Sequence, residues 1–225
     1  MEPTTAGMRG RKAEAARNDR TILDAARAVF VADPKAPISA VAHEAGVGVG
    51  ALYRRYAGKE ELLRTLCEDG LRRFTAIAES ALASDGDAWE AFATFLREVV
   101  DSDVHSLTVH LAGTFTPTRE MHELAAHAGS LSGRVVDRAK AAGALRPDVV
   151  AEDIPMIFDQ ITAVRAGDAD RTAVLRHRYL TLLLDGLRAG APATPLPASA
   201  PTGEELGRRW RHAESSRSSQ PPPRR

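Results

Sequence analysis

The stretch that decides the fold reads ISAVAHEAGVGVGALYRRYAGKEELL, residues 38–63. Two short runs typical of helices, about 38–45 and 49–56, are separated by Gly46-Val47-Gly48. A pair of short helices joined by a glycine-containing turn is typical of a helix-turn-helix, which we place at about 37–56. Gly46 stands where the first helix has to end. We therefore expect it to adopt a positive φ, the conformation that glycine tolerates best.

The second of these helices separates its residues into two faces. At about 100° per residue, one stripe collects the side chains that we expect to dock on the domain, namely Val49, Leu52, Tyr53 and Tyr56. The opposite face collects two small residues and two arginines, namely Gly50, Ala51, Arg54 and Arg55. Small residues allow a close approach to DNA, and arginine can pair with guanine or phosphate. The pattern indicates a major-groove recognition helix, but an ordinary amphipathic helix with two solvated arginines fits it equally well.

The rest of the chain is helical in pattern up to about residue 190, and no run alternates as a half-buried strand would. Glycine and proline interrupt the apolar periodicity and set the expected ends of the helices. The predicted fold is all-α, with a three-helix DNA-binding domain before a larger helical domain. The expected helices, about nine in total, span 18–32, 38–45, 49–56, 59–83, 87–101, 103–112, 117–142, 151–166 and 169–189.

A formal net charge of zero argues at first against a nucleic-acid partner. The charges are unevenly distributed, however. Residues 1–60 carry 10 basic and 7 acidic side chains, 61–190 carry 14 and 20, and 191–225 carry 6 and 3. An acidic middle is thus flanked by two basic ends, and the zero is an average over parts that differ in charge.

Composition excludes several classes of protein. The single cysteine, Cys67, leaves no possibility of an intrachain disulfide or a cysteine metal cluster, which suits a reducing cytosol. No apolar run reaches the length of a membrane span, and the basic N-terminal residues are not followed by the apolar segment of a secretory signal. We therefore expect a cytoplasmic protein without a membrane partner.

Residues 17–63 resemble the N-terminal domain of the TetR family of transcriptional regulators. The resemblance covers about 50 residues without a gap, and the matching positions keep the family spacing. They are Ile22, Leu23, Ala25, Ala26, Phe30, Ala42, Ala45, Gly46, Val47, Leu52, Tyr53, Tyr56, Lys59, Glu60, Leu62 and Leu63. A weaker resemblance links Leu145-Arg146-Pro147-Asp148 and Glu152-Asp153-Ile154-Pro155 to the entry of helix 8 in one subgroup of the family.

The resemblance implies a homodimeric repressor that binds double-stranded DNA at a palindromic operator and is released by a small-molecule effector. Tyr53 and Lys59 fall where family members contact phosphates, and Arg54 and Arg55 are the expected readers of bases or backbone. Ser39 is expected to cap the first helix of the motif or to meet phosphate. A basic arm over 1–16, with Arg9, Arg11 and Lys12, is expected to follow an adjacent groove.

Three positions depart from the family pattern. Family members usually carry Ser or Thr where this chain has Gly48 and Ala51, and Val49 replaces a polar or small residue. The hydroxyl contacts of the family therefore cannot be assigned here. DNA contact is expected to depend more on the two arginines and on backbone N–H groups.

The expected domains are the arm at 1–16, the DNA-binding domain at 17–74, an effector and dimerisation domain at 75–190, and a Pro/Ser/Arg-rich, largely disordered tail at 191–225. Aromatic residues suggest an effector pocket, although such residues are more often simply part of the core. The pocket candidates are Phe74, Trp89, Phe92, Phe95, His110, Phe115 and Phe158.

The helix at 169–189 has an apolar arc of about 200°, wider than burial on one side requires. One interpretation is that both faces are covered within one chain, but the family resemblance favours a two-fold interface formed with the preceding helix. The residues expected there are Ile157, Ile161, Leu180, Leu184 and Leu187.

No catalytic motif is present, so we expect no enzymatic activity and no cofactor. The spacing of His105, His110, His122 and His127 does not place pairs on one helix face, so no metal site is expected. Cys67 is most simply a core residue. The remaining alternatives are an enzyme or a helical protein-interaction module, either with a vestigial helix-turn-helix.

Overall fold

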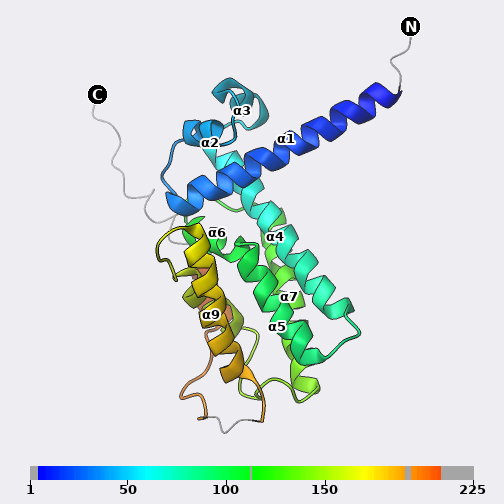
Figure 1. Cartoon of the computed structure of the whole chain (residues 1–225), viewed down its shortest axis with the longest axis vertical. Helices are drawn as coiled ribbons and strands as arrows, with labels where there is room; N and C mark the ends of the chain where they lie inside the picture. Colours follow the sequence, from blue (N-terminus) through cyan, green and yellow to red (C-terminus); the bar gives the residue numbers. More distant parts are fainter. Residues whose placement is uncertain (1–4, 112, 191–193, 209–225) are drawn as a thin grey trace. The chain divides into compact units, whose positions relative to one another are not determined.

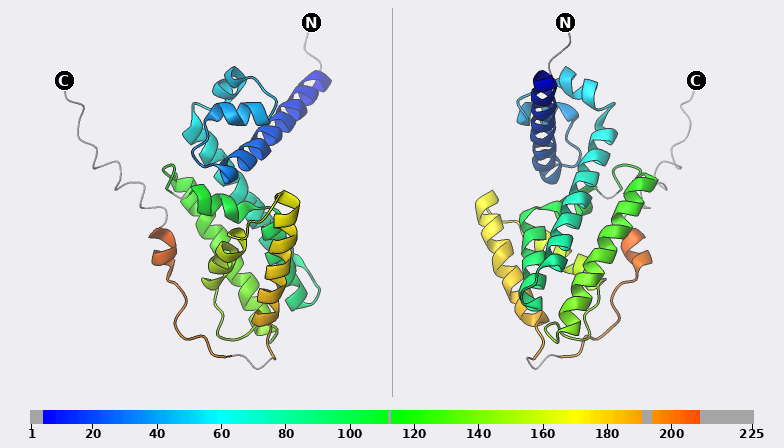
Figure 2. Two further views of the ribbon diagram at one scale, coloured as in Figure 1. Left: turned by 60° about the vertical axis from the view of Figure 1, so that its left-hand side comes forward. Right: turned by 90° about the vertical axis from the view of Figure 1, so that its right-hand side faces the viewer.

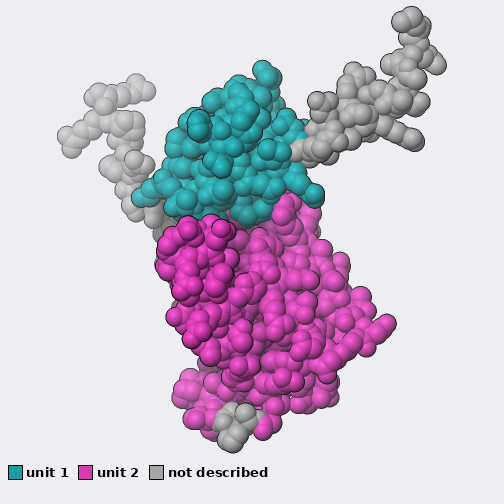
Figure 3. All heavy atoms as spheres, viewed as in Figure 1, with its two compact units in different colours: residues 1–66 teal, residues 67–225 magenta. Residues whose placement is uncertain are grey.

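The computed structural model describes the backbone of residues 5–111, 113–190 and 194–208, and their side chains except those of 5–17 and 108–110. The chain forms two compact units, Met1–Leu66 and Cys67–Arg225 (Figure 3). The boundary lies inside a helix, α4 (Lys59–Ala83), before the position at residue 74 expected from the sequence. Every regular element in the described ranges is helical, apart from an isolated antiparallel bridge between Leu145 and Arg188.

Unit 1 contains α1 (Thr5–Ala32), α2 (Ile38–Glu44), α3 (Val49–Arg55) and the start of α4. α2 packs on both α1 and α3, as the crossed helices in Figure 2 show. Gly46 ends α2 with a φ of +66°, which confirms the expectation for this turn. The side chains buried in this unit are Ile22, Ala25, Ala26, Phe30, Ala36, Ile38, Val41, Ala42, Leu52, Tyr56, Leu62, Leu63 and Leu66.

The expectation of a non-helical arm over 1–16 is wrong for the described backbone, because α1 begins at Thr5 and not near residue 18. Ala, Arg, Lys and Glu dominate residues 11–17, and all have high helix propensity. The helix can therefore continue without the apolar periodicity on which the sequence prediction relied.

Unit 2 contains the remainder of α4 together with α5 (Ala88–Asp101), α6 (Val104–Leu111), α7 (Arg119–Ala141), α8 (Asp153–Thr162) and α9 (Ala169–Leu187). α5 lies against α7, α8 and α9, and α6 lies against α8 (Figure 1). The observed bounds follow the predicted ones within about two residues except at α8, which ends at Thr162 instead of 166. Arg176 of α9 donates hydrogen bonds to the carbonyls of Thr162 and Val164, which the helix leaves unpaired where it ends.

Cationic side chains hold the loops of unit 2 by donating to backbone carbonyls. Arg138 of α7 donates to four carbonyls at the end of α4 and in the loop after it, those of Ala81, Leu82, Ser84 and Gly86. Lys140 donates to the carbonyl of Val149 over 2.9 Å. A positive charge at a helix C-terminus is favourable because the helix dipole is negative there. The turn between α4 and α5 is thereby tied to α7.

Part of the tail lies against the body of unit 2, and the prediction that 191–225 is largely disordered stays a prediction. Arg146 donates to the carbonyl of Thr194, and Asp148 accepts from the N–H of Leu196. The Arg146 hydrogen bond lowers the pKa of Asp148 to about 2. Residues 203–208 are helical, whereas 191–193 and 209–225 lie outside the described residues. None of the described helices combines the length and apolar character that a membrane span requires.

Candidate functional site

α3 has one docked side and one exposed side. Leu52 is fully buried and Tyr56 is 4% exposed, so these two residues anchor the helix. Val49 and Tyr53 are 40% and 55% exposed, so the prediction that all four apolar residues dock is wrong for half of them. Val49 and Tyr53 are four residues apart and lie along one edge of the stripe, which is uncovered, whereas Leu52 and Tyr56 lie along the covered edge. The solvent-facing side carries Gly50 and Arg54 as predicted, with Ala51 partly covered.

The two arginines of α3 differ in their partners. Arg55 donates from Nη2 to Oδ2 of Asp19 in α1 and forms an ion pair with it. Within the described residues, Arg54 has neither an ion pair nor a hydrogen bond. Burial raises the pKa of Tyr56, and the nearby Asp19 carboxylate raises it further. Only Arg54 is thus fully available to a ligand.

Lys59 is directed into the protein. Its Nζ donates to the carbonyl of Pro34 over 2.9 Å and to that of Ala36 over 2.7 Å, and it lies 5.0 Å from the centre of the Phe30 ring. Burial lowers the pKa of Lys59, and the charge of Asp33 opposes that effect. The ammonium group has three N–H donors and uses two of them on these carbonyls, so the phosphate contact expected from the family stays a prediction.

The starts of α2 and α3 lack side-chain caps. Pro37 and Gly48 occupy the N-cap positions, and neither supplies a capping hydrogen bond. The expectation that Ser39 caps α2 is wrong, since the helix begins one residue before it and Ser39 is exposed. The side chains of Arg9, Arg11 and Lys12 lie outside the described residues, so their expected groove contact stays a prediction.

The aromatic residues expected to line an effector pocket are mainly packed against one another. Phe74, Phe95 and Phe158 form edge-to-face pairs with ring centres 5.5 and 6.3 Å apart. Five of these pocket candidates have almost no exposure, namely Trp89, Phe92, Phe95, Phe115 and Phe158. Aromatic pairing and burial make them core residues in this conformation. The side chain of His110 lies outside the described residues.

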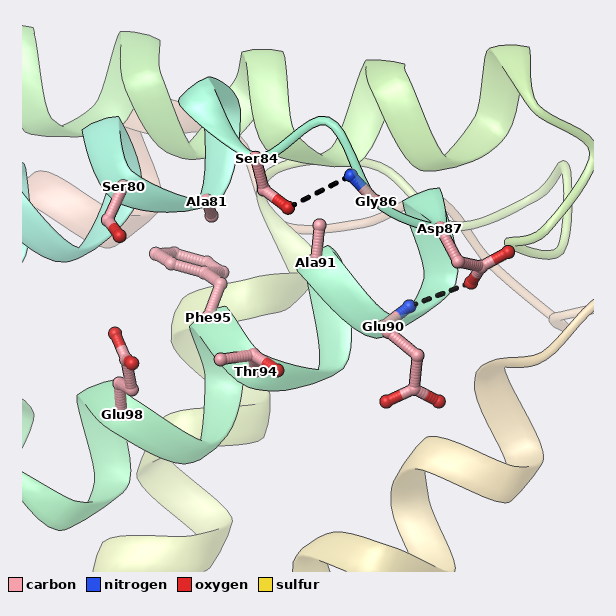
Figure 4. A pocket seen from close by; sticks show the side chains of 10 residues that line it. All are labelled: Ser80, Ala81, Ser84, Gly86, Asp87, Glu90, Ala91, Thr94, Phe95 and Glu98. Carbon is pink, nitrogen blue, oxygen red and sulfur yellow. Dashed lines mark hydrogen bonds between the residues drawn. The ribbon is translucent and has the colours of Figure 1, made fainter.

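A cavity of about 240 Å³ lies where α4 ends and α5 begins (Figure 4). Phe95 is the only predicted pocket residue that lines it. The other lining residues are Ser80, Ala81, Ser84, Gly86, Asp87, Glu90, Ala91, Thr94 and Glu98. The turn uses part of this polar lining internally, because Ser84 Oγ accepts from the Gly86 N–H and Asp87 accepts from the Glu90 N–H.

The residues predicted for the dimer interface face the core of their own chain. Ile157, Ile161, Leu180 and Leu184 are at most 8% exposed, and Leu187 packs partly buried against the same core. The prediction that these five residues form the dimer interface is therefore wrong. The exposed apolar side chains of α9 are Val174, Tyr179 and Leu182, at 58%, 45% and 60%. The apolar arc predicted their presence but could not tell which of its sides the core covers.

The histidines engage in unrelated contacts. His105 hydrogen-bonds Asp159 over 2.7 Å, and His122 hydrogen-bonds the Thr118 carbonyl. No group of three or more potential metal ligands comes together among the described residues. Cys67 is buried, and burial raises the pKa of its thiol to about 12, which leaves it unreactive as a nucleophile.

Asp19 is the site residue that sequence reasoning missed. It lies three residues before the buried Ile22, so the two share one face of α1 and Asp19 is brought close to α3. The spacing from Ile22 was a usable signal. The pairing with Arg55 needed the crossing of α1 and α3, which the sequence does not supply.

Comparison with known proteins gives two family matches and several structural ones. Residues 22–66 match the bacterial regulatory proteins of the tetR family, and residues 87–189 match the C-terminal domain of SbtR-like transcriptional regulators. A search of curated proteins gives no match.

Solved structures extend the similarity over most of the chain. A TetR regulator from Streptomyces coelicolor is 28% identical, with 77% of this chain and 99% of that chain covered and a TM-score of 0.56. One from Mycobacterium vanbaalenii is also 28% identical, with 79% and 99% covered and a TM-score of 0.56. LfrR from Mycobacterium smegmatis, solved with proflavine, is 22% identical, with 73% and 95% covered and a TM-score of 0.57, and shares the fold. Two family models placed in tandem, with full-length regulators of the same architecture, show that this chain belongs to the TetR family of transcriptional regulators.

Proposed function

We propose that the protein is a cytoplasmic, homodimeric repressor that binds a palindromic operator through α3 and is released by a small molecule. The observation that carries the DNA-binding part is the exposed side of α3, where Tyr53 and Arg54 face solvent while Leu52 and Tyr56 fix the helix. An exposed tyrosine and arginine on a rigidly docked short helix provide donors for phosphate and for base edges.

The test is binding of the purified protein to fragments from upstream of its own and neighbouring genes, measured by fluorescence anisotropy. Arg54→Ala is expected to lower the affinity for the bound fragment by about tenfold or more. Arg119→Ala removes an equally charged, highly exposed arginine of unit 2 and is expected to change it little. Equal effects of both variants would contradict the role assigned to α3.

The homodimer is supported by the apolar side of α9. At about 100° per residue, Val174, Leu182 and Tyr179 fall within about 140° of one another, on the side opposite Leu180 and Leu184. Such an exposed apolar stripe is typical of an association surface. Two-fold pairing would set the two α3 helices to meet half-sites about one DNA turn apart, and this is why the operator is expected to be palindromic.

Sedimentation at micromolar concentration tests the dimer. Leu182→Glu should dissociate it because a charge would be buried in the interface, whereas Leu196→Glu, at an exposed leucine outside α9, should not. Leu184→Glu is expected to unfold unit 2, since Leu184 is 2% exposed. A wild-type protein that sediments as a monomer would overturn the proposal.

Release by an effector follows from linkage, since a ligand that prefers the conformation unable to bind DNA weakens binding in proportion to that preference. The match of residues 87–189 to the C-terminal domain of SbtR-like transcriptional regulators supports this step, and the neighbour LfrR was solved with proflavine. Proflavine and other planar amines are suitable first probes. The expected result is a concentration-dependent loss of DNA binding, and binding that no probe alters would leave DNA binding as the only function.

A further inference from the structure

The two neighbouring arginines at the end of α3 differ in whether a carboxylate neutralises their charge. Arg55 is paired with Asp19, whereas Arg54, one residue earlier, has no such partner among the described side chains. Both line a groove of about 220 Å³ between α1 and α3, together with Asn18, Asp19, Ile22 and Ala51. Asp19 therefore places a negative charge on a surface whose other charged groups are cationic.

The ion pair has firm support at both ends. Asp19 shares a face of α1 with Ile22, which is 3% exposed, and Arg55 directly precedes Tyr56, which is 4% exposed. The side chains themselves remain accessible, at 29% for Asp19 and 53% for Arg55. Buried neighbours fix the two backbones, so the pair costs less conformational entropy than one between mobile elements. Both groups can still be reached by DNA.

A carboxylate at this position changes how Arg55 meets DNA. A paired guanidinium displaces fewer counterions from DNA, and the carboxylate repels phosphates. The guanidinium retains N–H donors that Asp19 does not use, and their direction is restricted by the ion pair. Arg55 thus loses general attraction for the backbone and keeps directional hydrogen bonding.

We propose that Asp19 is a specificity-determining residue, which holds Arg55 in an ion pair and thereby suppresses its non-specific contact with phosphate. This inference rests on the proposed DNA-binding function. It assigns Asp19 a positioning role, because the carboxylate acts through Arg55 and not by touching a base.

The primary test compares Asp19→Asn with Glu44→Gln in the full-length protein. Each removes one negative charge from unit 1, but Glu44 is exposed on α2 and pairs with no described residue. Affinities are measured over a salt series for the fragment bound by the wild type and for a scrambled duplex of equal length and composition. Thermal melting verifies that both variants are folded.

For Asp19→Asn we expect affinity for the scrambled duplex to rise about three- to fivefold. The slope of log K against log salt should steepen by about 0.9, the value for one added phosphate contact. The preference for the specific fragment should fall accordingly, while Glu44→Gln should leave it unchanged. An unchanged preference in Asp19→Asn, or an equal loss in Glu44→Gln, would overturn the inference.

A second comparison uses Arg55→Gln as the background. If Asp19 acts through Arg55, adding Asp19→Asn to Arg55→Gln has no further effect on the preference. If the preference still falls, the carboxylate acts alone and the positioning role is rejected. A wild-type protein that binds all duplexes equally would instead disprove the proposed function, so the two failures are distinguishable.

Discussion

Helices begin differently in the two units. α5, α7 and α9 of unit 2 each start at a side chain that accepts a backbone N–H, those of Asp87, Thr118 and Asp168. α2 and α3 of unit 1 are seven residues each and start at Pro37 and Gly48 without such a bond. Helices this short are unstable in isolation. Unit 2 thus contains helices whose starts are marked by a local capping residue, whereas α2 and α3 of unit 1 depend on their tertiary contacts.

The most severe disruption is expected in the aromatic core of unit 2. Phe158 is 1% exposed and contacts Phe95 and His105, so Phe158→Ala should lower the free energy of unfolding by about 4 kcal/mol through lost burial and a residual cavity. Urea denaturation followed by circular dichroism measures this. Leu196→Ala, at a 43% exposed site outside α9, is the control and should change it by less than about 0.5 kcal/mol. A mild effect of Phe158→Ala would mean that this core is loosely packed.

In unit 1 the corresponding change is Lys59→Ala. It leaves the Pro34 and Ala36 carbonyls without their charged donor and should destabilise unit 1 by about 2 kcal/mol. Native-state hydrogen exchange of α2 and α7 amides would assign the loss to unit 1. Lys35→Ala, at an exposed neighbouring lysine, is the control. If Lys59→Ala instead leaves stability intact and flattens the slope of log K for DNA against log salt by about 0.9, the result would support the phosphate contact expected from the family.

The caps of unit 2 are expected to contribute less. Asp168→Ala removes the acceptor of the Arg171 N–H, a 2.8 Å bond, and should cost about 1 kcal/mol in urea denaturation. Asp168→Asn keeps the acceptor and should retain most of that stability. Should both variants lose the same amount, charge near the helix dipole would be the cause, and the contrast between the units would not rest on capping.

The smallest effect is expected from adding to α3 of unit 1 the kind of side-chain cap that the helices of unit 2 have. Gly48 has an extended backbone with φ −69°, and a Cβ at this position would meet no atom within 4 Å. Gly48→Ser is therefore expected to cap α3 and raise stability by about 0.5 kcal/mol. Gly48→Ala adds the Cβ without a hydroxyl. Equal stabilisation by both would identify lower unfolded-state entropy as the cause, in place of capping.

Helix ends marked by a glycine were predicted well because that signal is local, whereas the start of α1 was not. Gly46, Gly143 and Gly167 each take a positive φ near +66° beside a helix end, and a glycine at such a place is visible in the sequence. Predictions that required tertiary knowledge fared worse. Periodicity found two apolar sides on α9, but only packing shows that Leu180 and Leu184 are covered and Leu182 is exposed. Likewise, a lysine at the start of α4 does not reveal the carbonyls within its reach.

The buried cysteine has a chemical consequence. Because burial raises the pKa of the Cys67 thiol to about 12, almost none of the thiol is ionised at neutral pH. Alkylating reagents should therefore react very slowly with Cys67 in the native protein. Unfolding of α4 around it would restore ordinary reactivity. The rate of its modification thus reports how often this part of the helix opens. A second cysteine introduced on the surface outside α9, at the exposed Leu196, would be the preferred site of labelling in the native chain.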